Sequence, residues 1–387
     1  MSASPAVSPR PTLLPGLTRL WRDRHTLQLG LGSGRAVLVE VANPRAVRVL
    51  DLLDGSRSER LVLARAADVD VSPDEARGLI DALRGAGLVV PAHTLLPRDL
   101  AGPARHRLAA EAGALALAAP GLPGTPAQVL RRRRAARVLV TGAGRLGAPV
   151  VVGLAQAGVG HVHPELTGVV RPADLVGTGL GAADLGCPLA PAVRAAVDRV
   201  APGTATRPLR RCRPDLVLQL GVDRPAELLA AGFAQRRQPH LLLTLREGVA
   251  TVGPLVHPPG GPCLRCVDLH RTDRDPGWPT LAAQLAGDAA DQCCDTATLL
   301  AAAGYAVAEA LAHLDGATPE TLGCAVEVTG AGRLRRRAWS PHPYCRCSGA
   351  GPVTRRPGDA ARAVRRPRIG GDRPQPAHGA AGRGPSR

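Results

Sequence analysis

Two pairs of closely spaced cysteines lie in the second half of the chain. Cys263 and Cys266 form a C-x-x-C pair, and Cys345 and Cys347 form a C-x-C pair. Cysteine thiolates with such spacings bind zinc tetrahedrally, and four protein ligands leave no open position for a catalytic water. The spacing therefore predicts a structural zinc site, in which His342 could replace one thiolate. The alternative is four unligated thiols.

A glycine-rich turn near the middle of the chain follows a short apolar run. Gly142, Gly144 and Gly147 fit the pattern G-x-G-x-x-G, directly after Val138-Leu139-Val140. Such glycines permit a tight turn and let phosphates approach the positive end of the next helix. The stretch predicts a nucleotide-binding turn between a buried parallel strand and a helix ending at Gly158. A purely structural glycine turn is the alternative.

Two charged residues could act with this turn. Arg145 lies inside it and could contact a phosphate. Asp223 follows a predicted buried strand at residues 215–218, at the sheet edge where open α/β folds bind ligands, and could hold magnesium. A solvated or helix-capping Asp before Pro225 is the alternative. Glu165 is the one acid placed to hold a nicotinamide ribose, and no residues for hydride transfer lie near it, so dehydrogenase activity is a weaker reading.

Cys293 and Cys294 precede a long apolar helical stretch. A thiol near a helix N-terminus has a depressed pKa and could act as a nucleophile. The adjacent carboxylates of Asp291 and Asp295 oppose thiolate formation, which favours an inert packing role.

The N-terminal part of the chain has the element order of a winged helix. Apolar residues alternate on both sides of Gly32-Ser33-Gly34, which predicts a β-hairpin. Asn43 is expected to cap a first helix, a second covers residues 59–66, and a Ser72 capping box opens a third. A closing strand is expected at residues 88–90.

This module could bind DNA or a peptide, or serve only as a structural appendage. A DNA reader needs basic residues on the outer face of its third helix. That face carries three acids and two arginines, which would repel phosphate: Asp74, Glu75 and Asp81 against Arg77 and Arg84. Peptide binding by strand addition to the hairpin edge therefore ranks first, a structural role second and DNA binding third.

The composition of the chain excludes lysine-dependent chemistry and weakens the argument for nucleic-acid binding from net charge. All 49 basic residues are Arg, so neither a P-loop lysine nor a Schiff-base lysine exists. The net charge of +17 is partly concentrated in residues 351–387, an Arg/Pro/Gly-rich stretch expected to be a disordered tail, so it supports nucleic-acid binding poorly. Neither a signal peptide nor an apolar run of membrane-spanning length is evident, which predicts a cytoplasmic protein without a membrane segment.

Taken as a whole, residues 135–350 resemble the ThiF-type fold of ubiquitin-activating enzymes and of the thiamin and molybdopterin sulfur-carrier activators. The resemblance follows RVLVTGAGRLG, DLVLQL, PCLRC, the helix after Cys294 and HPYCRC in order. It implies an α/β, Rossmann-like sheet with structural zinc, binding of ATP and magnesium, adenylation of the C-terminal carboxylate of a peptide or small protein, and a homodimer.

The first 94 residues resemble the PqqD-like module that recognises leader peptides of ribosomally made peptides. Residues 95–134 are expected to form a linker with one helix and a solvated arginine run. A PqqD-like module before a ThiF-like body implies delivery of a peptide to a cyclodehydratase-type partner enzyme in azole- and azoline-forming pathways.

Several positions depart from the ThiF pattern. Arg145 replaces a usual glycine, Gly177 stands where an arginine reaches phosphate, and the ATP-contacting lysine falls near Leu189. The acidic run that holds the ribose is replaced by Leu166-Thr167-Gly168, whereas Asp223 falls within about one position of the magnesium aspartate. Adenylation depends on stabilising charge at phosphate, so ATP chemistry is expected to be weakened or lost. An active adenylyltransferase and a DNA-associated winged-helix protein are the alternatives.

Overall fold

The computed structural model describes residues 10–31, 36–118, 123–210, 212–221, 225–258, 260–287 and 292–348. Three expectations fall outside these ranges: the Gly32-Ser33-Gly34 turn, Asp223 and the Arg-rich segment 351–387.

Strands form three sheets in the described part of the chain. Their bounds are β1 (Pro11–Leu13), β2 (Arg19–Trp21), β3 (Thr26–Leu29), β4 (Val37–Glu40), β5 (Val89–Pro91), β6 (Arg137–Gly142), β7 (His161–Leu166), β8 (Leu216–Leu220), β9 (His240–Arg246), β10 (Val249–Val256), β11 (Cys324–Thr329) and β12 (Arg333–Ala338).

Helices connect and cover these strands. The α-helices are α1 (Glu59–Ala66), α2 (Pro73–Gly85), α3 (Gly102–Leu117), α4 (Pro126–Ala135), α5 (Gly147–Gln156), α6 (Leu189–Val200), α7 (Ala226–Gln235), α8 (Leu264–Arg274), α9 (Trp278–Gly287) and α10 (Thr296–Asp315). The 3₁₀ helices are η1 (Pro44–Leu52), η2 (Ala67–Val69), η3 (Ala92–Thr94), η4 (Pro172–Leu175), η5 (Ala182–Asp184), η6 (Gly330–Gly332) and η7 (Arg346–Ser348).

The N-terminal unit packs its own apolar core beside a small antiparallel sheet, β2-β3-β4. The expected helices at residues 59–66 and from Ser72 onward are confirmed, and the Ser72–Glu75 capping box forms as expected. Asn43 caps its segment by accepting from the backbone N–H of Arg45, although that segment is the 3₁₀ helix η1. The closing strand β5 pairs with β1 in a separate sheet, and β2 was not anticipated from the sequence.

A seven-stranded sheet forms the core of the larger unit, in the order β12-β11-β10-β9-β8-β6-β7. The strands β9, β8, β6 and β7 are parallel, whereas β10, β11 and β12 extend the sheet in antiparallel fashion. Every residue of β8 is buried, as expected for a central strand covered on both faces. The expected α/β fold class is confirmed, whereas the antiparallel strands β10, β11 and β12 were not predicted from the sequence.

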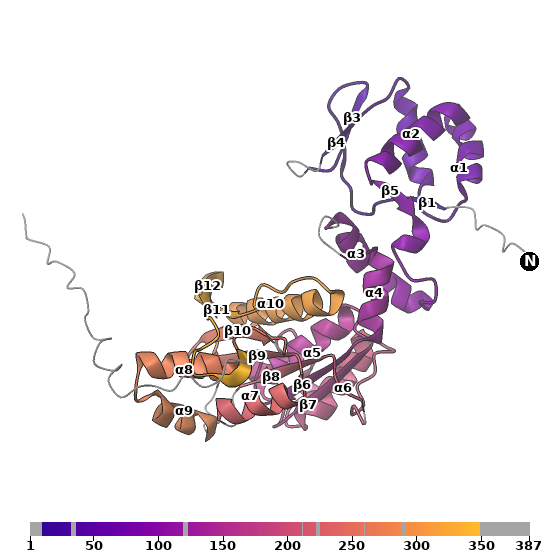
Figure 1. Ribbon diagram of the computed structural model, residues 1–387. Helices are drawn as coiled ribbons and strands as arrows, with labels where there is room; N and C mark the ends of the chain where they lie inside the picture. The colour runs from indigo at the N-terminus through magenta and orange to yellow at the C-terminus, as the bar shows by residue number, and fades with distance from the viewer. Residues whose placement is uncertain are drawn as a thin grey trace, which may run out of the picture.

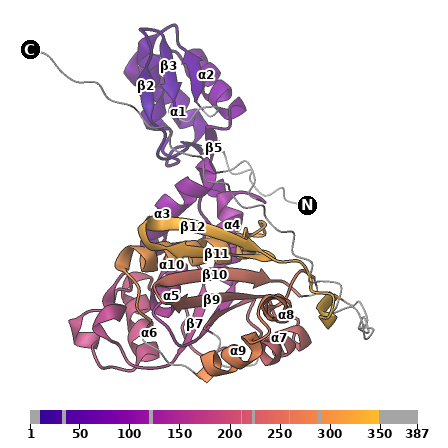
Figure 2. The same cartoon turned by 90° about the vertical axis from the view of Figure 1, so that its left-hand side faces the viewer.

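Helices cover the two faces of this sheet in separate groups (Figures 1 and 2). On one face, α5 packs against α6 and α10. On the other, α7 packs against α8. Because side chains alternate along a strand, Leu216 and Leu218 of β8 join the first core while Val217 joins the second.

The segment between the two units differs from the expected one-helix linker. It contains two helices, α3 and α4, which lie between the N-terminal unit and the large sheet in Figure 1. The arginine run at residues 131–134 lies within α4 rather than in a solvated linker. Arg133 is only 3% exposed.

Arg133 forms a buried ion pair that joins several helices. Its Nε and Nη2 donate to the two carboxylate oxygens of Asp315 at 2.8 and 2.7 Å, and Asp315 is also 3% exposed. Its Nη1 donates to Glu111 Oε1 at 2.5 Å and to the carbonyl oxygen of Ala157 at 3.1 Å. Bidentate arginine–carboxylate pairing is strong and fixes orientation. This network therefore ties α4 to the end of α10, to α3 and to the turn after α5.

From the sequence we expected no apolar segment of membrane-spanning length, and the helix α10 corrects that expectation. It is 20 residues long, and its best window has a mean hydropathy of 1.4, which is enough by length and composition to cross a membrane. In this fold, however, α10 packs against α5 and β10, with Leu299, Ala302 and Ala306 buried. Its apolar character is accounted for by its place in the core.

We predict that Asp315→Ala will lower the free energy of unfolding by about 3–5 kcal/mol, because it leaves the Arg133 guanidinium buried without its bidentate partner. The measurement is urea unfolding followed by circular dichroism. The control is Asp99→Ala, which removes the exposed ion pair with Arg134 and should cost about 0–1 kcal/mol. Equal effects of the two variants would contradict the role given to Arg133.

Candidate metal and nucleotide sites

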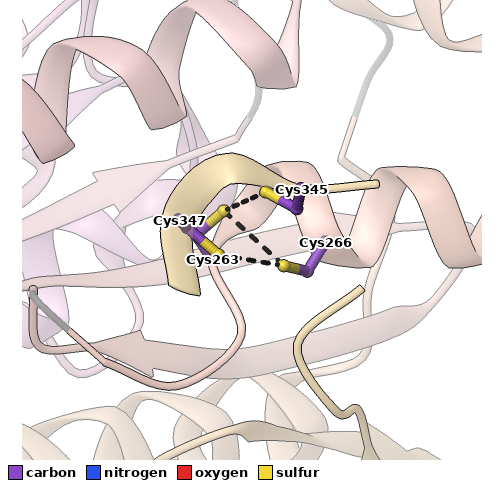
Figure 3. A group of neighbouring side chains, drawn as sticks. All are labelled: Cys263, Cys266, Cys345 and Cys347. Atoms are coloured by element: carbon purple, nitrogen blue, oxygen red, sulfur yellow. Dashed lines mark hydrogen bonds between the residues drawn. The ribbon is translucent and has the colours of Figure 1, made fainter. Parts of the chain in front are cut away.

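The four cysteines predicted to bind zinc come together from two distant segments. Cys263 is the N-cap residue of α8, and Cys266 lies in the first turn of that helix. Cys345 and Cys347 belong to the segment that follows β12. Figure 3 shows the four sulfur atoms turned toward one another.

The distances between these sulfur atoms suit one tetrahedral metal ion. Cys263 Sγ lies 3.5 Å from Cys345 Sγ and 3.9 Å from Cys266 Sγ, and Cys266 Sγ lies 3.3 Å from Cys347 Sγ. All four ligand atoms lie within 4.8 Å of one another. With a zinc–sulfur bond of about 2.3 Å, tetrahedral ligands are about 3.8 Å apart. The four thiols therefore fit a zinc ion, which would hold Cys345 and Cys347 against α8.

The environment of the cluster favours a thiolate at Cys266. Hydrogen bonding from Cys263 is the main cause that lowers the pKa of Cys266 to about 4, against the opposing effect of desolvation. The backbone N–H of His342 also donates to Cys266 Sγ, at 3.3 Å. The same pairing raises the pKa of Cys263. Desolvation is the main cause that raises the pKa of Cys347, so deprotonation of the full ligand set requires the charge of a bound metal ion.

His342 does not belong to the sulfur cluster, contrary to the option left open by the sequence. Its Nε2 lies 2.9 Å from Asp273 Oδ2, and its Nδ1 accepts from the backbone N–H of Tyr344 at 3.1 Å. Both ring nitrogens are thus engaged away from the thiols. The residue positions Cys266 through its backbone rather than through its imidazole.

The glycine turn joins β6 to α5 as the sequence predicts, and a glycine is sterically required at residue 142. Gly142 has φ = 113°, and a Cβ there would lie 2.4 Å from the carbonyl oxygen of Leu220. A Cβ at Gly147 would lie 2.7 Å from Leu220 Cδ1 and 2.8 Å from Leu166 Cδ2. These two glycines therefore allow close packing of the turn against neighbouring strands.

Gln292 lies at Gly144, the second glycine of the turn, a contact that sequence reasoning missed. Its Oε1 accepts from the backbone N–H of Arg145 at 3.0 Å and lies 2.8 Å from where a Cβ of Gly144 would be. A backbone N–H beside a helix N-terminus is the kind of donor that binds phosphate oxygens. A side-chain amide thus uses a donor that a nucleotide would need.

The Arg145 side chain also turns toward this segment instead of a phosphate. Its Nη1 donates to the carbonyl oxygens of Cys294 and Gln292 at 2.9 and 3.2 Å, and its Nη2 donates to that of Ala173 at 3.0 Å. Its Nε is buried without a hydrogen-bond partner in the described part of the chain. In this arrangement Arg145 holds the start of α10 against the glycine turn.

The sequence also pointed to Glu165, Cys294 and Asp223 as candidate functional residues. Glu165 accepts from the hydroxyl of Thr141 at 3.0 Å, beside the end of β6. Desolvation, followed by the charge of Asp295, raises the pKa of Cys294. This direction agrees with an inert thiol rather than a nucleophile. Asp223 lies outside the described residues, so its position relative to the turn stays a prediction.

We predict that the protein purified from zinc-containing medium carries zinc and that Cys263→Ser loses it, because three remaining thiols bind the ion much less tightly. Elemental analysis and thermal unfolding provide the measurement, with a lower melting temperature expected for the variant. Cys187→Ser, at an exposed thiol, is the matched control and should change neither value. Metal-free wild-type protein with normal stability would contradict the zinc assignment.

Comparisons with known proteins identify the fold. No protein-family profile matches the chain, and no curated protein matches it in sequence. Among solved structures, the microcin C7 biosynthetic enzyme MccB in complex with N-formylated MccA is 13% identical, with a TM-score of 0.60 over 88% of this chain and 99% of that one. E. coli MccB with ATP is 13% identical with a TM-score of 0.59, covering 87% of this chain and 98% of that one. The structure of PaaA is 15% identical with a TM-score of 0.58, covering 84% of this chain and 99% of that one. The chain therefore shares the ThiF-like fold of MccB.

Proposed function

We propose that this protein binds a peptide through its N-terminal unit and presents it to a partner modifying enzyme, of the cyclodehydratase type. Adenylation by the ThiF-like body is weakened or lost. Zinc is its structural metal, and it acts in the cytoplasm as a homodimer.

The observation that carries this proposal is the extent of the likeness to MccB. The match covers 88% of this chain and 99% of an MccB solved with the MccA peptide, so it is not limited to the large sheet. A fold shared over so much of the chain supports a peptide as the substrate class. The proposal includes that the N-terminal unit is a PqqD-like module.

The strand β4 offers a free edge for peptide addition. It pairs with β3 on one side and has no other strand beside it in the described part of the chain. The backbone N–H of Val41 donates to the carbonyl oxygen of His25, so these two residues form a hydrogen-bonded pair. Because such pairs alternate in antiparallel sheets, the backbone groups of Leu38 and Glu40 point outward. An extended peptide could bond to them without disturbing β3.

Exposed apolar side chains accompany this edge. Leu38 is 51% exposed and lies on the same sheet face as Leu20, which is 40% exposed, because both are in register with Gln28. A peptide strand added at β4 would cover part of this face. Backbone bonds would supply affinity and the apolar face would supply selectivity for side chains.

The outer face of α2 disfavours DNA as the ligand of this unit. Arg77 pairs with Asp74, and Arg84 pairs with both Asp81 and Glu59. The two arginines on the helix that would enter the major groove are thus already engaged with carboxylates. Phosphate binding there would have to break these pairs.

Two features of the glycine turn support weakened ATP chemistry. The Gln292 amide uses the backbone N–H of Arg145, and the Arg145 guanidinium donates to backbone carbonyls. The chain also contains no lysine to replace the missing phosphate contacts. Bound ATP would supply the phosphoryl chemistry that activates a carboxylate, with Gly142, Gly144 and Gly147 lying under the phosphates and Asp223 on magnesium.

The alternative function is a working adenylyltransferase of a peptide C-terminal carboxylate, favoured by the likeness to an MccB solved with ATP. In that case the Gln292 amide must leave the turn when the nucleotide binds.

We predict that Leu38→Pro weakens binding of a peptide at β4 by at least about tenfold, since proline removes an outward N–H but leaves the β3–β4 bonds intact. Fluorescence anisotropy of the full chain, with labelled peptides encoded beside its gene, provides the measurement. Leu38→Ala keeps the N–H and is the matched control, so its binding should change much less. If no such peptide binds the wild-type chain, the proposed function is wrong.

We predict that calorimetric titration of Mg·ATP into the zinc-loaded full chain gives no measurable heat at micromolar concentrations, because the backbone N–H and the guanidinium of Arg145 are engaged within the protein. The variant Asp223→Ala, which removes the proposed magnesium ligand, is titrated in parallel as the control. Micromolar binding that disappears in this variant would instead establish the adenylyltransferase alternative.

A further inference from the structure

The outer strand of the large sheet, β12, has an unusual sequence for an edge. It reads RLRRRA over residues 333–338, and Figure 2 shows it at the border of the sheet with β11 on its inner side. No other strand pairs with it in the described part of the chain. Arginines on an edge can serve only to prevent aggregation, so a binding role needs further support.

The register of β12 determines which backbone groups face outward. The N–H of Trp339 donates to the carbonyl oxygen of Gly323, which makes these two residues a hydrogen-bonded pair. By alternation, the backbones of Arg333, Arg335 and Arg337 also bond inward to β11. The N–H and C=O groups of Leu334 and Arg336 therefore point away from the sheet, ready to pair with an added strand.

The side chains of β12 alternate between the two faces of the sheet. Arg333, Arg335 and Arg337 lie on the face that carries Glu327, the residue opposite Arg335. Leu334 lies on the opposite face and is 59% exposed. An added strand would thus meet three guanidinium groups on one face, and on the other Leu334 beside Arg336, whose guanidinium donates to Cys324 Sγ and the carbonyl oxygen of Glu320.

The positive charge on this face exceeds the acids available to neutralise it. Glu327 is shared between Arg337 at 2.6 Å and Arg335 at 4.0 Å. Arg333 has no ion pair among the described residues. Arg271 of α8 lies close by. Desolvation is the main cause that lowers its pKa; the charges of Asp268 and Glu327 oppose this effect, and the like charges of Arg337 and Arg246 add to it. The surface therefore favours an anionic partner.

The geometry argues against two other occupants of this edge. A second copy of β12 would place arginines opposite arginines, and like charges directly across strands are destabilising. A nucleic acid offers phosphate acceptors for the guanidinium groups, but a DNA backbone has no donors for the outward C=O groups of Leu334 and Arg336, and an RNA backbone has only its 2′-hydroxyl groups. A polypeptide strand supplies both donors and acceptors in register.

We propose that β12 binds an acidic polypeptide segment by strand addition, with carboxylate side chains at alternate positions pairing with Arg333, Arg335 and Arg337. The intervening residue of the segment packs on Leu334. This surface is distinct from the β4 edge, so the proposal does not depend on the proposed function of the N-terminal unit.

The test is fluorescence anisotropy with the full-length chain and a labelled peptide, Glu-Thr-Glu-Leu-Glu-Thr. The same peptide with Gln in place of Glu should bind at least about tenfold more weakly, and binding should weaken as salt rises. Arg333→Glu combined with Arg335→Glu should cause a loss of similar size. Arg60→Glu combined with Arg98→Glu, two exposed arginines elsewhere, makes the same charge change and should leave binding nearly unchanged.

Strand addition is tested separately from charge. Leu334→Pro removes an outward N–H without breaking a bond to β11, and it should weaken binding more than Leu334→Ala does. Leu38→Pro on β4 should have no effect, which separates this surface from the N-terminal one. Circular dichroism of each variant verifies its fold.

The proposal would be overturned by equal binding of the Glu and Gln peptides, by binding that survives the Arg333/Arg335 double substitution, or by displacement of the peptide by a single-stranded oligonucleotide that binds β12 more tightly. No binding of the acidic peptide at low salt would also overturn it, and the arginines would then serve only to protect the edge.

Discussion

The bidentate ion pair between Arg133 and Asp315 is the contact on which the attachment of the connecting helices to the large unit depends. It is buried on both sides, and it fixes α4 to the C-terminal end of α10 while Glu111 of α3 takes a third bond. Because a buried guanidinium is costly without its partners, the helices that connect the N-terminal unit to the large sheet are held in one geometry. A solvated arginine run could not do this.

The same helix, α10, links the core to the candidate nucleotide site at its other end. Its first residues follow Gln292 and Cys294, whose oxygens receive bonds from the backbone and side chain of Arg145. The glycine turn keeps left-handed backbone angles at Gly142 and Gly144, yet the N–H of Arg145 within it is bonded to the Gln292 side chain. A turn of this kind suits a ThiF-like body whose proposed role is to support a peptide-handling unit.

In the described part of the chain, both sheets of functional interest end in a strand that is paired on one side only, and the two edges differ in chemistry. The β4 edge presents apolar side chains such as Leu38, whereas the β12 edge presents arginines and a lone Leu334. An edge strand is a hazard for aggregation, and charged side chains reduce that hazard. The same backbone geometry gives each edge the capacity to accept an added strand, and the side chains decide which strand is accepted.

Local patterns in the sequence were enough to predict the capping box at Ser72, the strand and helix around Gly142, and the cysteine pairs, because each depends on residues close together in the chain. The ThiF-like fold followed from the order of such patterns. Tertiary structure alone decided that Arg133 is buried against Asp315, that Gln292 reaches the turn at Arg145, and that the imidazole of His342 points away from the thiols. These contacts join residues far apart in sequence, so no local spacing encodes them. They exist only because the sheet and its helices bring the segments together.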